Sequence, residues 1–325
     1  MMKLAVIGAG AIGGWLTAGF VQGGASATVL ARGATLQALR SEGLRLEDGN
    51  SLRRINVNAT DDPVDLRDAD VLLLAVKAQD LPALAPVIGA TLRPRTTVLT
   101  AINGLPWWYF EAFGGPAQGL HLEAVDPGGV LARLMPAERV VGAVVHAASR
   151  AEAPGRIRLV AANSVLLGDA AEGRHAEGIA RHLAAGGIPA QASEVIHHAV
   201  WSKLWGNSNM NPLSALCRAD VSAMLDDSGV RSMAIAMMRE MSALGTRIGL
   251  SGFDDVEGRI ATTRKLGAFR TSMLQDVDAG RRLELAPILG ALVELAGRLD
   301  VPAPTMTGVH GLARLLDQSL AEPRP

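Results

Sequence analysis

A glycine-rich run near the N-terminus has the spacing of a phosphate-binding turn. Gly8-Ala9-Gly10-Ala11-Ile12-Gly13 matches the pattern G-x-G-x-x-G between a predicted strand and a predicted helix. Such glycines allow a tight turn, a close approach of the backbone to a pyrophosphate, and close packing of the helix on the strand. The free N–H groups at the helix start would face the phosphate charge. We therefore expect these six residues to bind a dinucleotide, the alternative being a glycine turn without a ligand.

Arg32 stands where a dinucleotide-binding protein distinguishes NAD from NADP. The second predicted strand ends about 20 residues after the glycine run, and the sequence there is Leu30-Ala31-Arg32-Gly33. An NAD-binding protein places Asp or Glu at this point against the ribose 2′-hydroxyl. An arginine with no acid beside it can instead pair with a 2′-phosphate, so the sequence favours NADP(H). A solvated Arg32 is the alternative.

Two polar residues follow other predicted strands, where a doubly wound sheet opens its binding crevice. Lys77 follows Ala75-Val76, and Asn103-Gly104 follow Thr100-Ala101-Ile102. We expect both to face the crevice, although Lys77 could be a surface lysine and Asn103-Gly104 a simple turn. The cluster Trp107-Trp108-Tyr109-Phe110 comes next. It could cover the crevice or pack in the core.

A polar stripe is expected on one long helix in the second half of the chain. Lys203, Asn207 and Asn211 are spaced i, i+4 and i+8, which places them on one helix face, with Trp201 and Trp205 on the opposite side. Asparagine is a poor helix former, and a solvated face would not need several of them. The spacing therefore favours a face that binds a ligand.

Glu284 lies among apolar residues in the run Leu283-Glu284-Leu285-Ala286. A carboxylate without a partner is costly there, so Glu284 either forms a structural ion pair or has a functional position. The adjacent His197 and His198 would point about 100° apart on a helix. No acid or cysteine stands at matching spacing, and we expect no metal site.

Alternating strand and helix patterns predict an α/β fold. Strand-like runs occur at 3–7, 27–30, 71–75, 97–100 and 140–145, a helix is expected at 11–22, and 79–90 has the length of a helix. This order predicts a Rossmann-type doubly wound sheet with parallel strands in its first half. From about residue 193 the pattern is helical. We expect a nucleotide-binding domain over 1–192 and an all-helical substrate domain over 193–325.

Composition excludes several classes of protein. The chain has 325 residues, 31 Lys and Arg against 32 Asp and Glu, and a net charge of −1, whereas proteins that bind nucleic acid carry clustered basic residues. Cys217 is the single cysteine, so no intramolecular disulfide can form. No signal peptide or membrane-length apolar run is readable. We expect a cytoplasmic protein that binds neither membranes nor nucleic acid.

Taken together, these stretches resemble the ketopantoate reductase family (2-dehydropantoate 2-reductases). The resemblance extends over nearly the whole chain and rests on the glycine run, Val76-Lys77-Ala78, Asn103-Gly104, the stretch from Trp201 to Leu213, and Ser272-Met273-Leu274-Gln275-Asp276 with Glu284. It implies a Rossmann domain and a helical domain, with NADPH and an α-keto acid meeting in the cleft between them.

The resemblance also implies roles for single residues. Lys203 matches the catalytic lysine of the family, Glu284 its active-site glutamate, and Ser272 its substrate-contacting serine. Asn103, Asn207 and Asn211 match polar contacts to substrate and cofactor. The implied reaction is NADPH-dependent reduction of 2-dehydropantoate to pantoate, in pantothenate biosynthesis, with Lys203 as proton donor. We expect Lys77, Asn103 and Glu284 to contact the cofactor as well.

Three departures from the family pattern concern the substrate. Phe269 replaces a residue that is often polar, Ala286 replaces an acid, and the aromatic cluster at 107–110 replaces a short polar sequence. A related NADP-dependent reductase acting on a different keto acid is therefore the alternative. A protein that binds NADPH without catalysis is the alternative of another class. A homodimer is possible on either reading.

Overall fold

The computed structural model describes residues 1–49 and 51–321, and the chain forms two compact units. Unit 1 comprises Met1–Ile102 and Gly129–Ala199, and unit 2 comprises Asn103–Gly128 and the chain from Val200 onward. The units therefore change at 199/200 rather than at the predicted 192/193. The segment 103–128, which the sequence places in the first domain, groups with the helices of unit 2. The division into a nucleotide-binding domain over 1–192 and a substrate domain over 193–325 stays a prediction.

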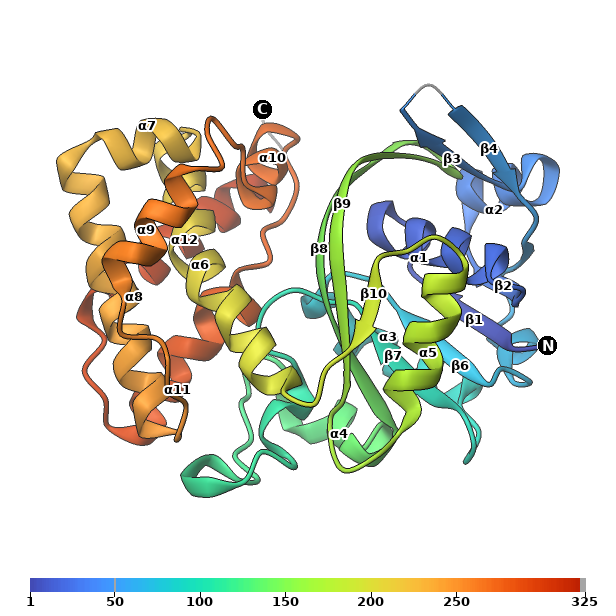
Figure 1. Cartoon of the computed structure of the whole chain (residues 1–325), viewed down its shortest axis with the longest axis horizontal. Coiled ribbons are helices and arrows are strands. Elements are labelled where there is room, and N and C mark those ends of the chain that lie inside the picture. Colours follow the sequence, from blue (N-terminus) through green and yellow to red (C-terminus); the bar gives the residue numbers. More distant parts are fainter. Residues whose placement is uncertain (50, 322–325) are drawn as a thin grey trace. The chain divides into compact units, whose positions relative to one another are not determined.

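In the described part of unit 1, ten strands form one mixed sheet, in the order β4-β3-β9-β8-β7-β6-β1-β2-β5 with β10 beside β9 (Figure 1). The pairs from β5 through β2, β1, β6 and β7 to β8 are parallel, whereas β8 and β9 are antiparallel. The strands are β1 (Lys3–Ile7), β2 (Ser26–Leu30), β3 (Leu44–Asp48), β4 (Ser51–Ile55), β5 (Asn58–Thr60), β6 (Val71–Leu74), β7 (Thr97–Thr100), β8 (Val140–Ala153), β9 (Arg156–Asp169) and β10 (Ala190–Ala192).

The predicted strands and the Rossmann-type parallel order are confirmed, but the sequence missed half of the sheet. β3 and β4 carry many charged side chains, and the last part of β8 and most of β9 are not buried. These segments lack the continuous apolar run by which a buried parallel strand is recognised. Figure 1 shows β8 and β9 as two long green strands that run along each other toward β3.

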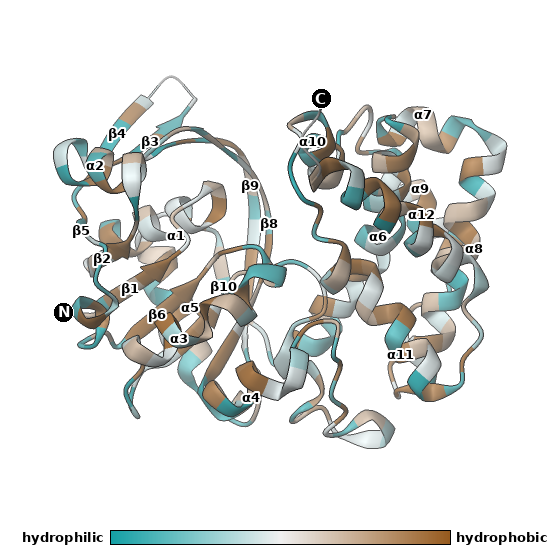
Figure 2. Cartoon of the chain, turned by 180° about the vertical axis from the view of Figure 1, so that it is seen from behind, coloured by the Kyte–Doolittle hydropathy of each residue, from teal (hydrophilic) through white to brown (hydrophobic). Residues whose placement is uncertain are grey.

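Helices cover the sheet in unit 1. They are α1 (Ala11–Gln22), α2 (Gly33–Glu42), α3 (Leu81–Thr91), α4 (Val130–Leu134) and α5 (His175–Ala185). Helix α1 has the predicted bounds, packs beside α5, and buries Trp15, Leu16 and Phe20, while Ile12 is only partly buried. All four residues of β6 are buried, so both faces of the sheet are covered there. Figure 2 shows the corresponding hydrophobic colouring along β1 and β6.

Unit 2 is helical, as the periodicity predicts, and has no strand among its described residues. Its helices are α6 (Ile196–Cys217, from Val200 onward), α7 (Val221–Asp226), α8 (Ser228–Arg247), α9 (Val256–Arg264), α10 (Ser272–Asp278), α11 (Ala291–Leu299) and α12 (Pro304–Ala321). A π-helical turn over Ala286–Gly290 precedes α11. Within residues 1–49 and 51–321, no helix has both the length and the apolarity to cross a membrane.

The segment 103–128 joins unit 2 through aromatic packing and backbone hydrogen bonds. Trp107, Trp108, Tyr109 and Phe110 are all buried, and the Tyr109 ring centroid lies 6.2 Å from that of Trp201. Glu294 of α11 accepts the N–H groups of Glu123 and Ala124 at 2.9 and 2.8 Å. Of the two interpretations of the aromatic cluster, core packing is therefore confirmed.

Candidate active site and nucleotide cavity

The glycine run forms an open cradle between β1 and α1. Gly8 has φ +101°, and a Cβ on it would lie 2.6 Å from the Ala75 oxygen. A Cβ on Gly13 would collide with the Gly8 carbonyl oxygen, so close packing of helix and strand requires this glycine. A Cβ on Gly10 would meet nothing within 4 Å. Gly10 caps α1 without a side-chain hydrogen bond, so the helix start presents N–H groups to open space, as a pyrophosphate requires.

A cavity of about 940 Å³ in unit 1 adjoins this cradle. Gly8, Ala9, Gly10 and Arg32 line it, together with residues of α3 and of the turn between β8 and β9. Ala11, Ile12 and Gly13 belong to the first turn of α1 and are not among the lining residues. The size suits a cofactor, since ligand pockets span about 300–1,000 Å³. The cradle and the cavity together fit a dinucleotide.

Lys77 lies at the rim of the sheet as predicted but does not line this cavity. It follows β6, is partly buried, and starts a 3-10 turn over Ala78–Asp80. Its neighbours Val76 and Asp80 line the cavity. Contact of Lys77 with the cofactor therefore stays a prediction.

Asp61 lies in the cavity wall that also contains Arg32. Strand β5 pairs with β2 so that Leu30 faces Thr60, and the Ala31 N–H donates to the Thr60 oxygen at 2.9 Å. The residue after β5 is Asp61, which accepts from Arg40 Nη2 at 3.3 Å. The sequence shows no acid directly after β2, whereas this acid follows the neighbouring strand β5. The cavity thus offers both a cation for a 2′-phosphate and a carboxylate for a ribose hydroxyl.

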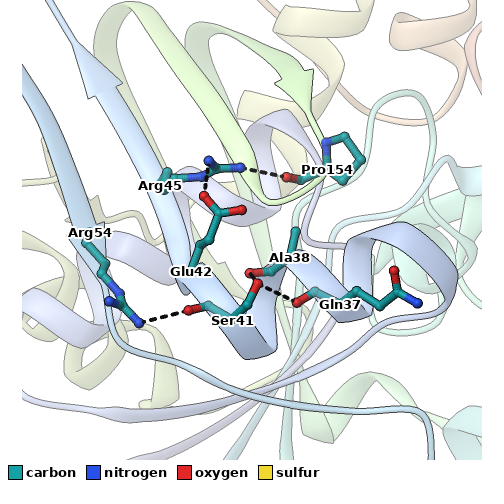
Figure 3. Close-up of polar contacts among 7 residues, drawn as sticks. All are labelled: Gln37, Ala38, Ser41, Glu42, Arg45, Arg54 and Pro154. Carbon is teal, nitrogen blue, oxygen red and sulfur yellow. Dashed lines mark hydrogen bonds and ion pairs between the residues drawn. The ribbon is translucent and has the colours of Figure 1, made fainter.

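The turn between β8 and β9 forms part of the cavity wall and is tethered to β3 (Figure 3). Arg45 of β3 donates from Nη2 to the Pro154 oxygen at 3.2 Å, and its Nη1 pairs with Glu42 of α2. The Arg45 backbone N–H also donates to the Gly155 oxygen at 2.8 Å. The contacts of Arg45 therefore join the β8–β9 turn to α2. Arg32 is the N-cap of this same helix.

Unit 2 holds a line of three candidate active-site side chains. The Lys203 Nζ donates to Asn103 Oδ1 at 2.9 Å, and Asn103 Nδ2 donates to Glu284 Oε2 at 3.5 Å. These residues are separated by 100 and 181 positions in the sequence. The amide of Asn103 therefore joins a lysine of α6 to a carboxylate that precedes the π-helical turn. The sequence predicted each of the three residues, and the fold brings them together.

The backbone around Gly104 explains why Asn103 reaches Glu284. Gly104 has φ +83°, and a Cβ there would collide with the Pro287 carbonyl oxygen. The Leu105 N–H donates to the same oxygen at 2.8 Å. Glycine is thus required for the close approach of two backbone segments, and this approach carries the Asn103 side chain to Glu284.

Burial and charge act on Lys203 in opposite directions. Burial lowers the pKa of Lys203 and the charge of Glu284 raises it, and the balance is a fall from 10.5 to about 8. A lysine with such a pKa is charged at neutral pH and still releases its proton readily. The site therefore has the requirements of a general acid.

The remaining predicted residues lie along α6 and at the start of α10. Asn207 is one helical turn after Lys203 and partly exposed, while Asn211 is buried. The Asn211 oxygen accepts from Ser214 Oγ at 2.9 Å, and Ser214 Oγ lies 2.5 Å from Thr271 Oγ1.

Thr271 is the N-cap of α10, so the exposed Ser272 is the first residue of that helix. These contacts join the two helices near Asn211 and Ser272. Binding of substrate by Asn207, Asn211 and Ser272 stays a prediction. In the described ranges 1–49 and 51–321, no three His, Cys, Asp or Glu side chains are placed to hold a metal ion.

Comparisons with known proteins identify the family of the chain. The family model described as ketopantoate reductase PanE/ApbA matches residues 4–108, and the model of its C-terminal part matches residues 195–317. The chain is 38% identical over 319 residues to the 2-dehydropantoate 2-reductase of Mesorhizobium japonicum, covering 97% of this chain and 98% of that one.

Two solved structures are similar over the whole chain. A protein of Ralstonia solanacearum MolK2, described as a candidate ketopantoate reductase, is 40% identical, with a TM-score of 0.92 and 98% of each chain covered. A D-mandelate dehydrogenase with NADH and anilino(oxo)acetate is 22% identical, with a TM-score of 0.83 and 99% and 100% coverage. The likeness to the second structure concerns the fold.

Proposed function

We propose that this chain, which belongs to the ketopantoate reductase family, reduces 2-dehydropantoate to pantoate with NADPH. Members of the family are oxidoreductases that act on a CH–OH group. The observation that carries the proposal is the line Lys203–Asn103–Glu284, in which a largely desolvated ammonium is held by a neutral amide. The corresponding pathway is pantothenate biosynthesis in the cytoplasm.

The residues of unit 2 supply the proton. Reduction of a ketone adds a hydride to the carbonyl carbon and builds negative charge on the oxygen. The Lys203 ammonium would stabilise this charge and transfer a proton from Nζ to the oxygen, which completes the alcohol. Asn103 orients the ammonium through its Oδ1 atom, and Glu284 favours the charged form of Lys203. Asn207, Asn211 and Ser272 would hold the rest of the keto acid.

The residues of unit 1 would hold the cofactor. The cradle from Gly8 to Gly13 would hold the pyrophosphate. Arg32, which lines the cavity, would pair with a 2′-phosphate. When bound, NADPH supplies the hydride. Asn103 and Glu284 remain predicted cofactor contacts as well.

A substrate panel tests the proposal. Oxidation of NADPH by the purified protein is followed with 2-dehydropantoate, with bulkier and aromatic keto acids, and with NADH in place of NADPH. We expect kcat/KM for 2-dehydropantoate to exceed that for the other acids by orders of magnitude. Faster reduction of another acid would support the alternative reductase, for which the exposed Phe269 beside α10 is the motive. NADPH binding without oxidation by any acid would support a non-catalytic protein.

The homodimer is also a proposal. Static light scattering of the purified chain measures the mass in solution, and a monomer mass would exclude it.

A further inference from the structure

We propose that Asp317 is a positioning residue that fixes the direction of Glu284. It lies on α12 of unit 2, far along the chain from every residue assigned a role above. The inference rests on the role proposed for Glu284 in the previous section.

Asp317 holds the two residues that come directly before Glu284. Its Oδ1 accepts the Leu283 N–H at 2.7 Å, and its Oδ2 accepts from Arg282 Nε at 2.9 Å. Residues 281–284 belong to no helix or strand, so the local backbone does not fix their course. Arg281 is held on α10, since its N–H donates to the Asp276 oxygen at 2.9 Å and its Nε to Asp276 Oδ1 at 2.8 Å. The contacts with α12 hold the two residues between this point and Glu284.

The chain is held on the other side of Glu284 as well. The Pro287 oxygen accepts the Leu105 N–H at 2.8 Å, and this places Asn103 beside Glu284. Glu284 thus lies between the Pro287 contact, which also positions Asn103, and the Asp317 contacts on α12. Loss of the Asp317 contacts would let the Glu284 carboxylate move away from Asn103.

The burial of Asp317 supports a dedicated role. Its exposed fraction is 7%, and a carboxylate that is so far removed from water is costly unless its oxygens are hydrogen-bonded. Both oxygens bind the loop that carries Glu284. A surface ion pair with Arg282 alone would need no buried partner.

Glu240 of α8 offers a matched control, because it also contacts α12. Its two carboxylate oxygens accept the N–H groups of Thr305 and Met306 at 2.8 Å each, at the start of α12. Both Glu240 and Asp317 therefore anchor α12 through backbone N–H groups in unit 2. Only Asp317 contacts the loop that precedes Glu284.

The test compares Asp317→Ala, Asp317→Asn, Glu240→Ala and Glu284→Gln. The readouts are the pKa of Lys203 from NMR titration of its side-chain amine, kcat for keto-acid reduction, and urea unfolding. We expect Asp317→Ala to lower the Lys203 pKa in the direction of Glu284→Gln and to reduce kcat about tenfold to a hundredfold. Asp317→Asn keeps an oxygen for the Leu283 N–H and should retain most of both properties. Glu240→Ala should change unfolding only.

Three results would overturn the inference. The first is an unchanged Lys203 pKa in folded Asp317→Ala. The second is an equal effect of Glu240→Ala. The third is independent, multiplying losses of kcat in the Asp317→Ala/Glu284→Gln double variant, because residues that act through one another are not additive. A wild-type protein that reduces no keto acid would overturn the proposed function, whereas the NMR titration would still decide the positioning of Glu284.

Discussion

The Lys203 Nζ atom lies 2.9 Å from Asn103 Oδ1, so the ammonium of α6 is held by a neutral amide. The Asn103 amide uses its other end for Glu284. The negative charge of Glu284 favours the protonated form of Lys203.

Replacement of Glu284 by Gln should move the pH profile of the reaction. The charge of Glu284 raises the pKa of Lys203 against the larger lowering by burial, and the balance is about 8. Without that charge the pKa falls below 8, so the basic limb of the kcat profile shifts to lower pH. Steady-state rates over a pH series measure this shift. A limb that stays in place would show that Lys203 is not the titrating acid.

The titration of Lys203 should also appear in the stability of the protein. Lys203 releases its proton at about 8 in the folded chain and at about 10.5 when unfolded. Between these values the unfolded state binds more protons, so the free energy of unfolding gains a contribution that rises with pH. Lys203→Met lacks this contribution. Urea unfolding across the interval should show wild type gaining stability relative to Lys203→Met, and parallel curves would contradict the lowered pKa.

Two glycine substitutions should separate binding from folding. Gly10→Ala places a Cβ in open space at the start of α1, so we expect a stable protein that binds NADPH more weakly. Gly13→Ala forces a Cβ against the Gly8 oxygen and should destabilise the fold by about 1–3 kcal/mol or more. Thermal unfolding and isothermal titration with NADPH measure both effects. Undiminished NADPH affinity in Gly10→Ala would exclude this turn as the pyrophosphate site.

The two charges in the cavity wall should influence the choice of cofactor in opposite directions. Arg32→Ala should weaken NADPH about tenfold to a hundredfold and leave NADH nearly unchanged, since it removes a charge-assisted pair with the 2′-phosphate. Asp61→Asn should tighten NADPH about threefold by removing a like charge.

Asp62→Asn is the matched control for Asp61. It removes the same charge one residue later, keeps the cap on the Val64 N–H, and is not a lining residue of the cavity. Dissociation constants for both nucleotides are measured by titration. Equal effects of Asp61→Asn and Asp62→Asn would show that only the overall charge matters.

Local spacing predicted the parts of the site that lie within one element. The role of the glycine run could be predicted because a strand, a turn and a helix follow one another within Lys3–Gln22. The spacing of Lys203 and Asn207 could be interpreted from the sequence because one helix carries both. Contacts between segments that are distant in the chain cannot be predicted from local spacing. Asp61 reaches the wall through the pairing of β5 with β2, and Asp317 reaches the Glu284 loop through the packing of α12.

The long β8–β9 hairpin shows a second limit of sequence analysis. The sequence predicts a strand at 140–145, which is the buried part of β8, and misses its exposed continuation to Ala153. Exposed strand residues carry no apolar run, because water can solvate their outer face. This continuation nevertheless leads to the Pro154 turn, which forms part of the cavity wall.

The central claim is that Lys203 donates the proton in NADPH-dependent reduction of 2-dehydropantoate. The most direct measurement compares single-turnover reduction by wild type and Lys203→Ala, with the NADPH dissociation constant of each determined separately. The account predicts a rate loss of about a hundredfold to ten-thousandfold with unchanged NADPH affinity, because the cradle at Gly8–Gly13 and Lys203 lie in different units. Full turnover by Lys203→Ala at unchanged NADPH affinity would contradict it.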